Sequence, residues 1–235
     1  MPMDAADYCR QLETYLCRKN EGHLIRIVGP TFEKVCGWAA MGVPFKVACR
    51  GIDRSCARYD AAGPRRRPVR IEFCEADVLD EFDRWRRAVG VTATGAAGEP
   101  AGDAHGSSRT SLPRHLDRVL ARLTAVRAGR ALSPGFAARV DAVIDEVDRL
   151  RAGAKGLRGA ARAAALARLA ALDRAVLDAA REELAAQREA LAREAAGELA
   201  PFRARMAPEA WASSVEAGVD RLVRERLGLP CLELN

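Results

Sequence analysis

Apolar residues recur every three or four positions through the C-terminal part of the chain, residues 113–235. This period is that of an amphipathic α-helix, which turns one face towards a core. It predicts helices within residues 116–126 and 136–150, a longer one over about 158–199 and a last one over about 208–227. Because the apolar stripes are narrow and the connections short, we expect an antiparallel helical bundle or hairpin.

Helical and strand-like patterns alternate in the N-terminal part, residues 1–90. The run HLIRIV at residues 23–28 contains β-branched side chains and is followed by a Gly-Pro pair, so it predicts a strand. A second short strand is expected within RRRPVRIEFC, residues 65–74. Helical spacing predicts helices over residues 4–20, 32–41, 44–59 and 76–89.

Residues 91–112 are poor in large apolar side chains and rich in Gly, Ala, Ser and Thr. Such a segment buries too little surface to offset the entropy lost on ordering, which predicts a flexible linker. The sequence therefore predicts a mainly α protein in three parts: a small α+β domain over residues 1–90, the linker 91–112 and a helical bundle domain over 113–235.

Positive charge exceeds negative charge in this chain of 235 residues, with 38 Lys or Arg against 32 Asp or Glu and a net charge of +6. This excess suggests a polyanionic partner such as nucleic acid. No run approaches the roughly 18 uncharged residues of a membrane-spanning helix, so no membrane contact is expected. Acidic residues stand near the start, where a signal peptide would be basic, so we expect a cytoplasmic protein.

Cysteine and histidine residues show no spacing typical of a catalytic or metal site. The seven cysteines include no C-x-x-C pair, and we interpret them as reduced, buried small side chains. The glycine-rich loops that bind phosphate in nucleotide-binding proteins are absent from the sequence. We therefore expect no metal, no cofactor and no catalytic residue, and a protein that is not an enzyme.

A row of cations runs along the helix predicted over residues 44–59. Lys46, Arg50, Arg54 and Arg58 recur at every fourth position, which places them on one side of a helix. Like charges at this spacing repel one another, whereas a phosphate backbone would bind them. The alternative is an ordinary solvated helix face in an arginine-rich protein.

A second basic cluster precedes an acidic segment. Arg65, Arg66, Arg67 and Arg70 lie in a turn that a Gly-Pro pair introduces, where guanidinium groups can reach phosphate oxygens. Residues 71–83 contain six acids and no base. The alternative is that this acidic segment folds back on the arginines in an internal network of ion pairs.

These segments resemble a known class of DNA-binding module. Residues 31–59, TFEKVCGWAAMGVPFKVACRGIDRSCARY, resemble a helix-turn-helix, and RRRPVRIEF resembles the wing of winged-helix modules. In that family the second helix enters the major groove and the wing contacts the backbone or minor groove. The resemblance implies that Gly42 is the turn glycine and Val43 the buried residue after it. It also implies DNA contacts from Lys46, Arg50 and Arg54, and from Arg65, Arg66 and Arg67 at the wing tip.

The sequence thus favours a nucleic-acid-binding protein with duplex DNA as its partner, in replication, plasmid maintenance or transcription control. Residues 113–235 would provide self-association or contact with a protein partner. The alternative is a structural adaptor, whose basic N-terminal part binds an acidic protein and whose bundle binds helices. An enzyme with a site assembled only in space is the third hypothesis.

Overall fold

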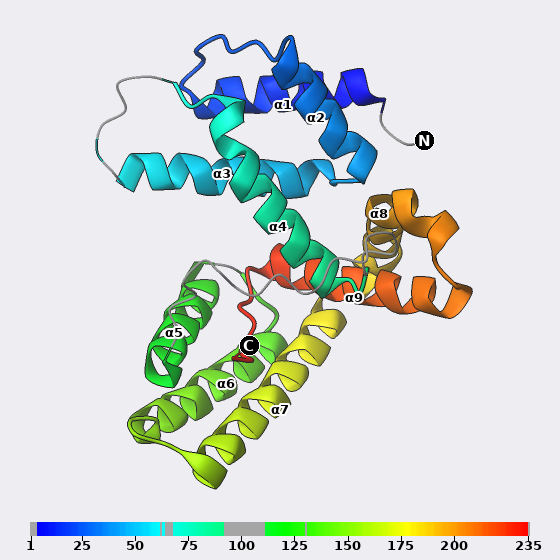
Figure 1. Cartoon of the computed structure of the whole chain (residues 1–235). Coiled ribbons are helices and arrows are strands. Elements are labelled where there is room, and N and C mark those ends of the chain that lie inside the picture. Colours follow the sequence, from blue (N-terminus) through cyan, green and yellow to red (C-terminus); the bar gives the residue numbers. More distant parts are fainter. Residues whose placement is uncertain (1–3, 62, 64–67, 92–110, 130, 235) are drawn as a thin grey trace. The chain divides into compact units, whose positions relative to one another are not determined.

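The computed structural model of the chain describes residues 4–61, 63, 68–91, 111–129 and 131–234 (Figure 1). These residues are mainly helical, as the sequence predicts. They divide into two compact units, Met1–Thr94 with Ala196–Ala217 (unit 1) and Gly95–Ala195 with Gly218–Asn235 (unit 2). Residues 196–217, which the apolar pattern grouped with the bundle over 113–235, therefore pack with the N-terminal part.

Unit 1 is built around α3, which packs against α1 and most extensively against α4. Its core is formed by fully buried side chains such as Leu12, Trp38 and Ile52, and Phe202 packs into the same core. The elements are α1 (Ala5–Lys19), α2 (Pro30–Met41), α3 (Phe45–Ala61), η1 (Ile71–Cys74), α4 (Glu75–Ala88), the end of α8 (Arg188–Leu199), η3 (Ala200–Arg205) and the first half of α9 (Pro208–Leu227).

The turn between α2 and α3 is formed around Gly42. Gly42 ends α2 in the left-handed conformation, with φ 81°, and Val43 is buried. A side chain at position 42 would also meet the ring of Phe202, because a Cβ there would lie 2.9 Å from Phe202 Cζ. Glycine is therefore required at this turn both by conformation and by packing.

The two strands expected in residues 1–90 do not form among the residues that the structure describes, so the α+β, winged-helix expectation is wrong there. Ile71 and Cys74 are both buried, at the spacing of one helical turn, and they belong to the 3₁₀ turn η1. Just before η1, Asn20 takes the place of a strand partner for Val69. Its Oδ1 accepts from the Val69 N–H at 2.7 Å and its Nδ2 donates to the Val69 carbonyl at 3.0 Å. The residues 23–28 connect α1 to α2 and form no ladder.

In unit 2, α5 packs against α6 and α6 against α7 (Figure 1). Ser133 caps α6 by accepting a hydrogen bond from the Phe136 N–H at 3.2 Å, and Pro134 follows as the first helical residue. The elements are α5 (Leu112–Gly129), α6 (Pro134–Gly153), α7 (Gly159–Glu183), η2 (Ala185–Gln187), the first part of α8 and the second half of α9.

A buried ion pair fixes the C-terminal tail within unit 2. The Asp173 carboxylate binds the Arg224 guanidinium, with Nη2 2.6 Å from Oδ2, and accepts from the Leu232 N–H at 2.8 Å. The Leu232 carbonyl lies 2.8 Å from a ring nitrogen of His115 on α5. Leu232 is therefore fully buried although it lies in a segment without regular structure.

Candidate nucleic-acid interface

The cation row predicted on residues 44–59 does not stay on one side of α3. Four residues turn an α-helix by about 400°, so the row moves by about 40° around the helix at each step. Lys46 is exposed and Arg50 is half-buried, and both interact with other residues of the chain. Arg54 and Arg58, one and two steps further on, reach the neighbouring helix α4.

Arg54 and Arg58 bind the acidic side chains of α4. Arg58 Nη2 lies 2.8 Å from Asp77 Oδ2, and Arg54 Nε lies 3.6 Å from Asp77 Oδ1. Arg54 also pairs with Asp80 and, at 3.4 Å, with Glu81. Its hydrogen bond to Asp80 is the main cause of the raised pKa of the Arg54 guanidinium. Two of the four cations of the row on α3 therefore form an internal ion-pair network.

Asp77 is the centre of this network. Its side chain is only 5% exposed, whereas those of Arg54 and Arg58 are 42% and 60% exposed. A buried carboxylate needs counter-charges, because transfer from water into the interior disfavours its ionised form. The acidic segment over residues 71–83 therefore forms an internal network of ion pairs, which was the alternative interpretation of the sequence. In the described part of the chain it binds Arg54 and Arg58 of α3.

The basic turn contributes one described residue to the candidate interface. Arg70 is exposed at the start of η1, and its carbonyl accepts from the Cys74 thiol at 3.5 Å. Arg65, Arg66 and Arg67, the predicted wing tip, lie outside the described residues.

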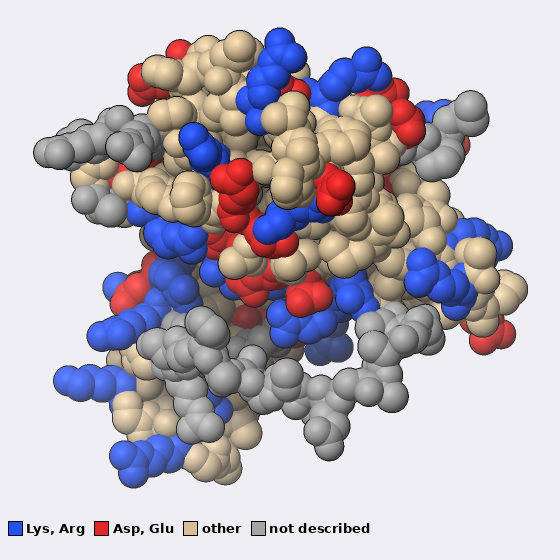
Figure 2. Space-filling model, turned by 45° about the horizontal axis from the view of Figure 1, so that its top comes forward, with Lys and Arg blue, Asp and Glu red and all other residues tan. Residues whose placement is uncertain are grey.

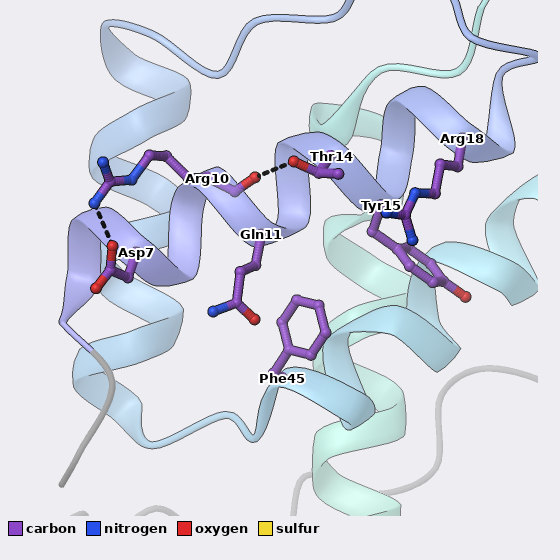
Figure 3. Close-up of a pocket in the computed structure, with 7 residues that line it drawn as sticks. All are labelled: Asp7, Arg10, Gln11, Thr14, Tyr15, Arg18 and Phe45. Atoms are coloured by element: carbon purple, nitrogen blue, oxygen red, sulfur yellow. Dashed lines mark hydrogen bonds and ion pairs between the residues drawn. The ribbon is translucent and has the colours of Figure 1, made fainter.

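A pocket of about 450 Å³ lies along α1, which the sequence did not single out (Figure 3). Thr14 donates to the Arg10 carbonyl at 2.9 Å and Arg10 pairs with Asp7, so these polar groups are already engaged. The aromatic side of the pocket is formed by Tyr15 and Phe45, whose rings meet edge to face. Its lining is Asp7, Arg10, Gln11, Thr14, Tyr15, Arg18 and Phe45.

The Tyr15 hydroxyl is held at the edge of the pocket by Asp53 of α3. It donates to both carboxylate oxygens at 2.8 Å, and Lys19 Nζ lies 2.7 Å from Asp53 Oδ1. Burial, with the hydrogen bond to Asp53, raises the pKa of Tyr15 to about 12. Tyr15 is thus a neutral hydrogen-bond donor at physiological pH, and the group joins α1 to α3.

A second row of arginines lies on α5 in unit 2. Arg114, Arg118 and Arg122 are spaced by four residues, as on α3, and all three are exposed. No hydrogen bond or ion pair joins their side chains to any described residue. This row was not singled out from the sequence, although its spacing of four is the same as that on α3.

Several other arginines of unit 2 do form ion pairs. Arg127 binds Asp141, Arg168 binds Glu146 and Arg181 binds Asp220, each through contacts of 2.7–2.8 Å. The one acid of α5, Asp117, pairs with Arg151 of α6 at 3.4 Å. In Figure 2, basic side chains project from the lower left of the view, where α5 to α7 lie in Figure 1.

The described residues thus define a mainly α-helical protein of two units, with ion-paired arginines on α3 and a row of exposed arginines on α5. No protein-family model matches the chain, and no curated protein or solved structure matches it either. Within the described ranges, no three His, Cys, Asp or Glu side chains gather as metal ligands would. No helix in this part of the chain has both the length and the apolar character needed to cross a bilayer.

Proposed function

We propose that the chain binds nucleic acid through its phosphate backbone and that the arginine row of α5 makes the main contact. The observation that carries the proposal is that Arg114, Arg118 and Arg122 are all exposed, lie within about 80° of one another around α5 and form no ion pair with the described residues. Their Cα atoms rise by about 6 Å from one arginine to the next, since an α-helix rises 1.5 Å per residue. A regular row of one charge sign suits a regularly charged polymer.

The surroundings of the row favour a phosphate backbone over a protein partner. The exposed neighbours of the row on α5 include the small Ala121 and Ala125 and one acid, Asp117, which pairs with Arg151 of α6, and the large apolar side chains of the helix are buried on its other side. A stable protein interface needs aromatic or aliphatic anchors at its centre, which this side of the helix lacks. Binding to phosphates needs cations alone, because the release of counterions drives it.

Of the residues predicted to bind DNA from the sequence, Lys46, Arg50 and Arg70 remain candidate contacts in unit 1. Arg54 and Arg58 suit this role less well, because binding phosphate would remove the counter-charges of the buried Asp77.

The test measures fluorescence anisotropy of a labelled, random-sequence DNA duplex titrated with the whole protein. The variant Arg114→Glu/Arg118→Glu/Arg122→Glu should lose binding at every salt concentration. The milder Arg→Gln triple variant should lower the slope of log affinity against log salt by about 2.7, since each phosphate contact contributes about 0.9. Circular dichroism and thermal unfolding establish that both variants fold.

A matched control reverses three exposed arginines that do not form a row, Arg139, Arg162 and Arg174. It changes the net charge by the same amount as the α5 variant, so it should weaken binding much less. If the α5 variant binds DNA as the wild type does, the proposed function is wrong. If both variants lose binding equally, net charge alone is responsible and the α5 site is wrong.

A further inference from the structure

The segment that connects α1 to α2 has the burial pattern of a β-strand although it forms no ladder. Ile25 and Ile27 are buried, at 9% and 4% exposed. Leu24 and Val28 are 78% and 64% exposed, and Arg26 between them is exposed as well. Burial that changes at every residue is characteristic of extended backbone, in which successive side chains point to opposite faces. Residues 24–28 therefore alternate in burial as a strand would, although they form no strand with the described residues.

Contacts with unit 1 hold this segment in place. The Cys17 sulfur accepts from the Ile25 N–H at 3.3 Å and lies 3.6 Å from the Ile25 carbonyl, to which its thiol donates. The segment begins after Gly22 and ends at Gly29, whose φ values of 85° and 60° turn the chain at both ends. It is therefore ordered before any partner binds, which lowers the entropy lost on binding.

One backbone edge of the segment is open. In extended chain, the N–H and C=O groups of alternate residues point to the same edge. Ile25 uses its groups on Cys17, whereas no described residue forms a hydrogen bond with the backbone N–H or C=O of Leu24, Arg26 or Val28. An ordered strand with an unpaired edge is a template for another strand.

We propose that this edge binds an extended segment of another protein by strand addition, with an acidic side chain placed opposite Arg26. Backbone hydrogen bonds to Leu24, Arg26 and Val28 would pair the two strands. The exposed side chains of Leu24 and Val28 would pack against apolar side chains of the partner that lie two residues before and two residues after its acidic residue. A second copy of this chain does not suit the edge. Antiparallel self-pairing centred on the segment places Arg26 opposite Arg26, and like charges directly opposite destabilise a strand pair.

The inference goes beyond the proposed nucleic-acid binding, because it concerns a different segment of the chain and a different class of partner. Substitution of Arg26 leaves the arginine row of α5 unchanged. An experiment that contradicts peptide binding at Arg26 therefore does not contradict nucleic-acid binding at α5, and the reverse holds as well.

The probe is a blocked, fluorescein-labelled peptide in which Val, Glu and Val alternate with Thr, so that the Val and Glu side chains share one face of a strand. Its anisotropy should rise saturably with the whole protein. Arg26→Glu should weaken binding at least tenfold, and a peptide with Lys in place of Glu should restore it to that variant. The matched control, Arg18→Glu, reverses another exposed arginine of unit 1 and should bind as the wild type does.

Amide hydrogen exchange provides a second measurement that does not depend on the charge. The N–H groups of Leu24, Arg26 and Val28 should exchange rapidly in the free protein and at least tenfold more slowly with the peptide. A peptide methylated at the backbone nitrogens that pair with the edge should fail to bind.

Three results would overturn the proposal. The first is no binding of the peptide at about 1 mM, the weak end of measurable affinity. The second is binding that neither Arg26→Glu nor backbone methylation weakens. The third is sedimentation of the free protein as a dimer that Leu24→Arg dissociates, which would show that a second copy occupies the edge.

Discussion

Gly51 of α3 lies directly against the backbone of Val78 in α4. A Cβ at position 51 would stand 2.4 Å from Val78 Cα, closer than any real side chain can approach. The absence of a side chain therefore lets the two helices come into close contact at this point. This contact brings Arg54 and Arg58, one turn and two turns along α3, within reach of the acids of α4.

Replacing Gly51 by alanine should force α3 and α4 apart. We expect Gly51→Ala to lower the free energy of unfolding by about 1–3 kcal/mol, the usual effect of overpacking a core, measured by urea denaturation. Gly37→Ala on α2 is the control, because a Cβ there meets nothing within 4 Å and its φ is not positive. That control should raise stability by about 0.4–1 kcal/mol. Equal stability of the two variants would contradict the close contact of α3 and α4.

Removing the counter-charges of Asp77 should destabilise unit 1 without removing nucleic-acid binding. The double variant Arg54→Ala/Arg58→Ala leaves a carboxylate that is 5% exposed without its arginines. We expect a loss of about 1–3 kcal/mol in unfolding free energy, the penalty of an unsatisfied buried group. Arg10→Ala, which removes an exposed ion pair with Asp7, should change stability by less than about 0.5 kcal/mol.

The same double variant separates a structural role of Arg54 and Arg58 from a role in binding. If it keeps its stability but loses affinity for the DNA duplex, these arginines contact DNA and the ion-pair network with α4 is dispensable.

The buried ion pair of unit 2 should hold the C-terminal tail. Asp173→Ala leaves Arg224, whose side chain is 17% exposed, without its carboxylate and the Leu232 N–H without its acceptor. We expect unit 2 to lose about 3 kcal/mol of stability and the Leu232 amide to exchange faster. On the same helix, Asp178 forms an exposed pair with Arg181, so Asp178→Ala should change stability by less than about 0.5 kcal/mol. Slow exchange at Leu232 in Asp173→Ala would show that other contacts hold the tail.

Tyr15 should make the stability of unit 1 sensitive to alkaline pH. Burial, with the hydrogen bond to Asp53, raises the pKa of Tyr15 from 10.0 to about 12 in the folded chain. A raised pKa in the folded state gives stability that is fully present below pH 10 and is lost as the pH rises towards 12. Unfolding free energies measured across this window should therefore fall less steeply in Tyr15→Phe than in the wild type. Equal slopes would show that Tyr15 ionises alike in both states.

The helices of this protein could be predicted because their signal is local. Apolar residues at helical spacing, Ser133 with Pro134 at a start and Gly42 at an end act within a few residues of the chain. The strand expected at residues 23–28 has a local signal as well, in its β-branched side chains, but no strand forms there. A ladder was not predictable from that signal, because it depends on a second segment elsewhere in the chain.

The candidate interface shows the same division between local and distant information. The sequence alone shows cations at every fourth position in two helices. The first set is Lys46, Arg50, Arg54 and Arg58, and the second is Arg114, Arg118 and Arg122. Which cations are neutralised depends on the helix that packs beside each row. On α3 that helix is the acidic α4, whereas Arg114, Arg118 and Arg122 of α5 form no ion pair with the described residues.

The sequence by itself therefore determined that the chain is mainly helical, where most helices lie and which positions carry rows of positive charge. The tertiary structure alone decided that Arg54 and Arg58 stabilise a buried carboxylate, that residues 196–217 belong with the N-terminal part, and that residues 23–28 form no ladder with the described residues. The physical reason is the distance along the chain over which each interaction acts. Helical periodicity acts over three or four neighbouring residues, whereas ion pairs and strand pairing join residues that only the packing of α3, α4 and the α1–α2 connection brings together.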